Sequence, residues 1–113
     1  MAFYYLILHT KFGRTKKTNL EEANFYGANW KWASLSESYI KNTVLADTNL
    51  TPYQIKSACN WEEGIYKMIY SIDDKRGLVV DKNKKANDDY IKCLKWDKQS
   101  DPQVPPDCSH WNN

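Results

Sequence analysis

The spacing of small and large apolar residues between positions 18 and 52 has a period of five. In groups of five, this segment runs TNLEE, ANFYG, ANWKW, ASLSE, SYIKN, TVLAD and TNLTP. The first residue of every group is Ala, Ser or Thr, and the third is always large and apolar: Leu20, Phe25, Trp30, Leu35, Ile40, Leu45 and Leu50. Neither a helix, with a period of about 3.6, nor a strand, with a period of about 2, generates this pattern. The segment is therefore predicted to be a repeat structure.

A period of five predicts a coil with corners. A chain that turns after every fifth residue closes a four-sided coil in about twenty residues, and successive coils stack at roughly the 4.7–4.9 Å spacing of paired strands. The large third residues would fill the interior, and the small first residues would fit beside them. Stacking would place Leu20 on Ile40 and Phe25 on Leu45.

These groups resemble the repeat of the pentapeptide-repeat proteins, which is a small residue, Asn or Asp, Leu or Phe, and two variable residues. TNLEE, ANFYG and TNLTP fit it closely, ANWKW differs at Trp30, and ASLSE, SYIKN and TVLAD depart at the second position. The resemblance implies a mainly β fold, a right-handed quadrilateral β-helix of about two coils. Residues 50–66 resemble the helix that closes many cyanobacterial members of this family, and residues 95–111 are similar to their tails.

Three parts of one structural domain are expected: an N-terminal strand and basic arm (1–17), the β-helix (18–52), and a C-terminal helical cap with an extended tail (53–113). Seven groups of five make fewer than two coils, whereas stacked repeats need about three units for stability. The apolar residues 3–8 are predicted to form a strand that adds a layer. An end-to-end homodimer is the alternative source of additional core.

The cap is predicted to begin with a helix, because Thr51, Pro52 and Gln54 form a capping box with Pro at the first helical position. An apolar stripe continues to Ile69, and Gly64 is expected to weaken the helix. Further elements are expected after it: a strand at Leu78–Val80, a helix at Asn87–Trp96 with Asp88 and Asp89 at its positive end, and an extended tail from Ser100 that wraps the domain through Cys108 and Trp111.

The three cysteines are Cys59, Cys93 and Cys108, an odd number that cannot be fully paired within one chain. Three reduced thiols are expected in a cytoplasmic protein, and the cytoplasm is the expected location. The alternative is a Cys59–Cys108 disulfide that ties the tail to the cap and leaves Cys93 free. That bridge would favour a lumenal or periplasmic compartment.

Charge and hydropathy exclude several classes of protein. The 113 residues carry 16 basic and 14 acidic side chains, a net charge of +2, so no nucleic-acid partner is expected. The longest apolar run, residues 1–8, is far shorter than the roughly 20 residues that a transmembrane helix needs. Residues 18–52 carry two basic and four acidic side chains, which is a low charge density for a DNA mimic.

No enzyme, metal or cofactor is expected. The two histidines, His9 and His110, are far apart in sequence, and the spacing of Cys108 and His110 does not fit a structural zinc motif. The favoured function is a protein–protein interaction or scaffold module with an unknown partner. Its candidate partner surface consists of the outward-facing Tyr26, Trp32 and Tyr39, since aromatic residues dominate interface energetics. The alternative, implied by the resemblance, is a DNA-mimicking topoisomerase (gyrase) regulator.

Overall fold

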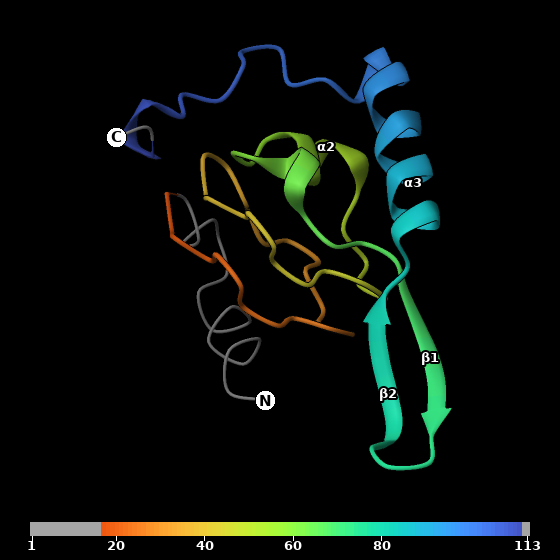
Figure 1. Ribbon diagram of the computed structural model, residues 1–113. Helices are drawn as coiled ribbons and strands as arrows, with labels where there is room; N and C mark the ends of the chain where they lie inside the picture. The colour runs from red at the N-terminus through yellow and green to blue at the C-terminus, as the bar shows by residue number, and fades with distance from the viewer. Residues whose placement is uncertain (1–16, 112–113) are drawn as a thin grey trace.

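The computed structural model describes residues 17–111 (Figure 1). Stacked loops formed by residues 17–50 lead into a short helix, a protruding hairpin, a longer helix and a tail that returns to the loops (Figure 1). The predicted strand at residues 3–8, nearly all of the basic arm and His9 lie outside the described residues. The elements are α2 (Pro52–Lys56), β1 (Met68–Asp73), β2 (Gly77–Lys82), α3 (Lys84–Trp96) and 3-10 turns at Trp61–Glu63, Lys98–Ser100 and Ser109–Trp111.

The period of five is built into the backbone of the loops. Every fifth residue lies in the left-handed region, with φ between +54° and +72°: Glu22, Gly27, Trp32, Glu37, Asn42 and Asp47. Before three of these corners an asparagine side chain accepts a hydrogen bond of 3.0 Å from the N–H two residues on: Asn19, Asn24 and Asn29. Such local bonds stabilise turns. In these three groups the asparagine at the second position thus supports the corner.

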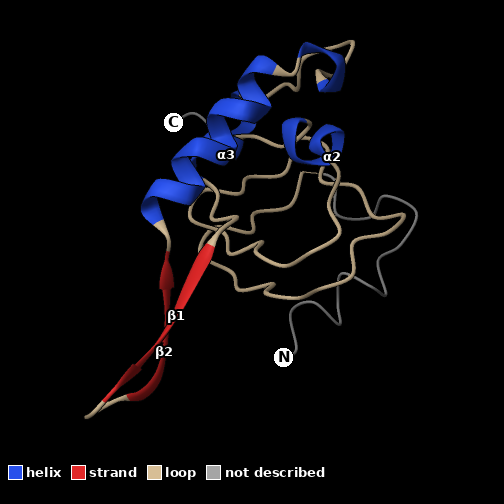
Figure 2. Cartoon of the chain, turned by 90° about the vertical axis from the view of Figure 1, so that its right-hand side faces the viewer, coloured by secondary structure: helices blue, strands red, loops and turns tan. Residues whose placement is uncertain are grey.

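Successive loops pair about twenty residues apart. Asn19 pairs with Tyr39 and Asn24 with Val44 in parallel bridges, and the pairing continues from Tyr39 to Cys59 and from Val44 to Ile65. The chain therefore adds a third layer after residue 57, which the period of five does not reveal (Figure 2). Within the described part of the loops no continuous strand is formed, and the pairing consists of isolated bridges. Parallel pairing at a spacing of about twenty residues is present, and within residues 17–111 continuous strands occur only in the hairpin.

The interior of the loops is formed by the third residues of the repeat. Six of the seven are buried, with at most 8% of the residue exposed, and Leu50 is half-buried. Phe25 and Trp30 meet edge to face with their ring centroids 5.1 Å apart. Burial of a large apolar side chain contributes roughly 1.5–3 kcal/mol. The third residues therefore form the core.

The predicted C-terminal helix is present as α2, but it is shorter than expected. The predicted capping box between Thr51 and Gln54 is formed, with Pro52 at the first helical position. The helix ends at Lys56 and does not continue toward Ile69, because residues 57–65 pair with the loop beneath them instead. The Gln54 amide donates to the carbonyl oxygens of Trp30 (3.1 Å) and Ala33 (2.8 Å), and so fixes α2 on the loops.

Gly64 has a different role from the predicted one. It lies after a 3-10 turn, where an added Cβ would come within 2.5 Å of the Tyr66 hydroxyl oxygen. The buried Tyr66 hydroxyl donates to the carbonyl oxygen of Trp61. Burial raises the pKa of Tyr66 far above its usual value, so the hydroxyl remains a donor. Glycine is needed here for close packing.

The hairpin and α3 follow. The predicted strand at Leu78–Val80 is part of β2, which pairs with β1 in antiparallel register from Met68↔Lys82 to Asp73↔Gly77. Helix α3 starts three residues before the predicted Asn87, with Asn83 as its N-cap. Asp88 and Asp89 lie beyond the first helical turn, so they pair with lysines one turn earlier, at 2.9 Å each, and do not sit at the positive end.

Two buried polar side chains hold α3 against α2 and against the residues that lead into the hairpin. Asn87 is 1% exposed; its amide oxygen accepts from the N–H groups of Tyr66 (2.6 Å) and Lys67 (3.1 Å), and its amide nitrogen donates to the Gly64 carbonyl (3.1 Å). Lys56 is 5% exposed and its ammonium caps the carboxyl end of α3. It donates to the carbonyl oxygens of Leu94 (2.6 Å) and Asp97 (2.9 Å) and to the Ser100 hydroxyl (3.1 Å), and it pairs with Asp101.

Candidate interaction surface

Tyr26 lies where the first loop meets the hairpin. Its ring packs edge to face on Tyr70 of β1, with centroids 5.9 Å apart, and its hydroxyl donates to Asp47 Oδ2 at 2.7 Å. Tyr70 also reaches this carboxylate, at 3.5 Å. Since Tyr26 is still 39% exposed, it forms part of the boundary between loops and hairpin and also of the surface.

Trp32 lies at one of the left-handed corners of the loops. Its backbone is left-handed, with φ of +71°, and 78% of the residue is exposed. The Lys31 ammonium lies 5.3 Å from the centre of its ring. The exposure of Trp32 shows that it does not pack on the start of α2, which follows twenty residues later.

Tyr39 is covered by the tail. It is half-buried, and the Trp111 ring stacks on it with centroids 5.6 Å apart and planes 20° apart. Tyr26 thus borders the hairpin, Tyr39 borders the tail, and Trp32 stands at a corner of its own. The three predicted surface residues do not form one patch, and Trp32 is the most exposed of them.

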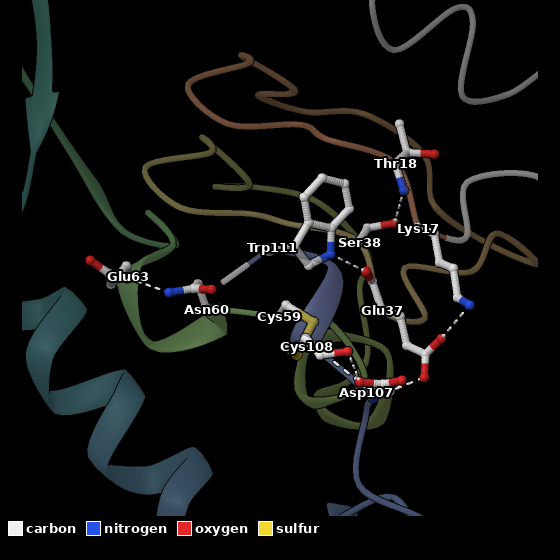
Figure 3. The surroundings of a disulfide bond; sticks show 11 residues. Lys17, Thr18, Glu37, Ser38, Cys59, Asn60, Glu63, Asp107, Cys108 and Trp111 are labelled. Carbon is white, nitrogen blue, oxygen red and sulfur yellow. Dashed lines mark hydrogen bonds and ion pairs between the residues drawn. A yellow bond between two sulfur atoms is a disulfide. The ribbon is translucent and has the colours of Figure 1, made fainter. Parts of the chain in front are cut away.

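The tail is attached to the loops around a disulfide (Figure 3). Cys59 and Cys108 are bonded, with their Cα atoms 5.7 Å apart, and the free Cys93 is exposed on α3. Around the bridge, Glu37 accepts from the Asp107 N–H (2.9 Å) through its carboxylate and from the Trp111 indole N–H (2.7 Å) through its carbonyl. The hydroxyl and N–H of Ser109 hold the pKa of Asp107 below its usual range.

The hairpin carries an apolar surface that the sequence analysis missed. Ile72 is 79% exposed and Leu78 is 65% exposed, and the register places them opposite each other. The signal was present in the sequence, because Tyr70 and Ile72 alternate with polar residues as in a strand. The apolar stripe of the helix predicted from Pro52 also extends to Ile69, so the two patterns overlap at the start of this strand.

Among residues 17–111 no group of three or more His, Cys, Asp or Glu side chains is arranged to hold a metal ion. No helix in that part of the chain is long and apolar enough to cross a membrane. His110 is exposed and packs edge to face on Trp111, with centroids 4.6 Å apart.

Comparison with family models finds eight copies of the pentapeptide repeat in residues 16–51. This segment belongs to the pentapeptide-repeat family. No curated protein and no solved structure matches the chain. The family match starts two residues before the predicted boundary at 18 and ends one residue before the boundary at 52.

The pentapeptide repeats account for the loops and for Tyr26, Trp32 and Tyr39, all of which lie within them. The helices, the hairpin and the tail lie after the matched residues. Pentapeptide repeats imply a β-helical solenoid, and the pairing of residues twenty apart agrees with that expectation. The repeat match therefore covers the loops, whereas the apolar hairpin lies outside it.

Proposed function

We propose that this pentapeptide-repeat protein is a non-enzymatic interaction module that presents Trp32 to a protein partner. The observation that supports it is the 78% exposure of a tryptophan held at a backbone corner. Tryptophan is among the residues most enriched at the energetic centres of protein interfaces. The corner is fixed by the Ala33 N–H bond to the Trp30 carbonyl (2.9 Å) and by the Asn29 side chain, so little backbone freedom is lost on binding.

A capture experiment with a matched control tests this function. The wild type, Trp32→Ala and Trp96→Ala proteins are immobilised and exposed to lysate of the native host, and the bound proteins are identified by mass spectrometry. Trp96 is a suitable control because it is 83% exposed but lies at the end of α3. The expected result is a partner retained by wild type and Trp96→Ala and lost with Trp32→Ala. The proposal is contradicted if the wild type and both variants retain the same partner, or if none of the three proteins enriches a partner.

For the repeat segment itself, the finer architecture proposed is a right-handed four-sided β-helix of about two coils. The left-handed corner at every fifth residue and the parallel pairing at a spacing of twenty support it. An experimentally determined structure of the full chain tests the number of sides and the handedness. A segment with a different number of corners in each coil contradicts it.

An oxidising compartment is proposed in place of the expected cytoplasm. The disulfide between Cys59 and Cys108 supports this location, because such bonds persist mainly in oxidising environments. Alkylation of the non-reduced protein isolated from its host tests the proposal. One modified thiol, at Cys93, is expected, and three modified thiols contradict it.

The DNA-mimicking gyrase regulator remains an alternative that rests on the resemblance alone. Residues 18–52 hold only two more acidic than basic side chains, which is little for a mimic of a DNA rod. A gyrase supercoiling assay separates the two functions. The interaction module is expected to leave supercoiling unchanged.

A further inference from the structure

The β1–β2 hairpin projects beyond the stacked loops (Figures 1 and 2). In an antiparallel pair, directly opposite residues share a face. The pairs Tyr70↔Val80 and Ile72↔Leu78 therefore lie on one face, which we call the apolar hairpin face. All four residues are exposed, by 47%, 39%, 79% and 65% in that order. A two-stranded sheet with such a face is only marginally stable by itself in water.

The same face borders a hollow at the base of the hairpin, where β1 passes the loops. The hollow has a volume of about 220 Å³ and is lined by Asn24, Tyr26, Val44, Met68, Tyr70 and Val80. A cavity of about 150 Å³ holds a benzene-sized molecule, so this hollow has room for a branched aliphatic side chain. Its lining is mostly apolar.

We propose that the apolar hairpin face is a self-association surface, and that its occupant is a second copy of this chain related by a twofold axis. In this arrangement the hairpins lie antiparallel and face to face. Ile72 and Leu78 at the tip of one copy enter the hollow at the base of the other, and the second copy does the same in return. The contact is closed, because a twofold axis uses the same surface on both copies.

A second copy fits because the protruding residues and the hollow lie on one surface. Ile72 is two residues beyond Tyr70, which is a shift of roughly 6.5–7 Å along a strand. That short offset allows two antiparallel hairpins to fill each other's hollows at once. A partner with a single protruding side chain would fill the hollow and leave the tip exposed.

The exposed area agrees with a dimer. Tyr26, Tyr70, Ile72, Leu78 and Val80 are between 39% and 79% exposed. Large side chains present roughly 150–250 Å² each, so these five leave about 500 Å² open on each copy. Two copies would bury about 1,000 Å² of apolar surface before polar neighbours are counted, which reaches the lower limit for a specific interface.

The antiparallel arrangement brings one lysine at the hairpin tip close to an exposed carboxylate at the base of the other copy. Asp47 is exposed beside the hollow, where Tyr26 and Tyr70 donate to its carboxylate. The turn at the hairpin tip carries the exposed Asp74, Lys75 and Arg76, and Arg76 is already paired with Asp73 at 3.5 Å. When the tip of one copy lies over the base of the other, Lys75 approaches the Asp47 of the other copy.

The test is sedimentation equilibrium of the full chain from about 5 to 200 μM, the range in which weak protein dimers dissociate. Every variant carries Cys93→Ser, so that the exposed thiol cannot link two copies. Ile72→Asp is compared with Ile69→Asp, because Ile69 pairs with Asp81 and lies on the opposite face of the same strand. A dimer is expected that Ile72→Asp weakens at least about tenfold and that Ile69→Asp leaves intact.

A charge exchange provides a second readout that leaves Ile72 and Leu78 in place. Asp47→Lys is expected to weaken the dimer, and adding Lys75→Asp is expected to restore it in low salt. The proposal is overturned if the parent protein stays monomeric at the highest concentration, or if Ile69→Asp disrupts the dimer as much as Ile72→Asp. A dimer that resists Ile72→Asp would instead indicate end-to-end stacking of the loops and would also overturn it. None of these outcomes bears on Trp32, so this proposal and the interaction function fail independently.

Discussion

The stacked loops of residues 17–50 and the region that follows residue 57 are stabilised in different ways. In the loops the same contacts recur: an asparagine at the second position supports three of the corners, a large third residue fills the core, and backbone bonds join residues about twenty apart. In the later region each contact occurs once. Asn87, Lys56 and the Cys59–Cys108 disulfide each join segments that are distant in sequence.

Repeated and single contacts predict different responses to substitution in the two regions. When one corner bond of the loops is lost, the bonds of the adjacent corners still hold the chain in place. The free energy of unfolding then falls only by the contribution of one exposed hydrogen bond. When Asn87 is lost, three backbone groups lose their only partner on α3. Buried groups without a partner cost far more than exposed ones, because water cannot replace the bond.

The largest expected effect comes from a matched pair of asparagine substitutions. Asn87→Leu leaves the N–H groups of Tyr66 and Lys67 and the Gly64 carbonyl without their partner, and should lower the free energy of unfolding by roughly 3–5 kcal/mol. Asn19→Leu removes one exposed corner bond, to the Glu21 N–H, and should cost about 1 kcal/mol. Urea unfolding followed by tryptophan fluorescence measures both. Equal losses would contradict the distinction between repeated and single contacts.

The sequence predicted the loops because the same signal appears seven times, and each repetition makes a chance pattern less plausible. The third residues, the capping box at Thr51 and the strand at Leu78–Val80 all rest on local rules. The end of α2 at Lys56 was missed because it depends on Cys59 and Ile65 pairing with a loop about twenty residues earlier. A single non-local contact leaves no period in the sequence.

Non-local contacts also determine the candidate interaction surface. The outward orientation of Trp32 follows from its place in the repeat, and its exposure agrees with that expectation. That Trp111 covers Tyr39 depends on where the tail returns, and neither residue signals the other. Similarly, the apolar hairpin face exists only because β1 and β2 pair in one register, which brings Ile72 opposite Leu78.

The disulfide is the next largest contribution and belongs to the region of single contacts. Replacement of Cys59 and Cys108 by serine removes a bridge between residues 49 apart in sequence. The cost is expected to be about 2–4 kcal/mol, chiefly because the unfolded chain gains freedom. Calorimetry of the double variant against wild type measures the change in melting temperature, with Cys93→Ser as the control. A shift with Cys93→Ser as large as that of the double variant would contradict the assignment.

A smaller effect is expected at the corners of the loops. The backbone of Glu22 is left-handed, with φ of +64°, whereas the backbone of the adjacent Glu21 has no positive φ. A side chain in that conformation costs roughly 1–2 kcal/mol, and glycine's extra freedom in the unfolded chain offsets about 0.5–1 kcal/mol of the relief. Glu22→Gly should therefore stabilise by up to about 1 kcal/mol, while Glu21→Gly should destabilise by a similar amount. Chemical unfolding of both variants tests the opposite signs.

The smallest effect concerns the pH dependence of the ion pair between Lys56 and Asp101. The Lys56 ammonium, which donates to the Asp101 carboxylate, holds the pKa of Asp101 below its usual range. As the pH falls, the Asp101 carboxylate therefore takes up a proton at a higher pH in the unfolded chain than in the folded chain. The stabilisation is therefore complete above the ordinary carboxyl pKa of about 4 and is lost as the pH falls below it. Unfolding midpoints of wild type and Asp101→Asn, measured from neutral to acidic pH, should differ slightly near neutrality and converge in acid. A difference that persists unchanged in acid would show that the Asp101 charge does not contribute to holding the end of α3.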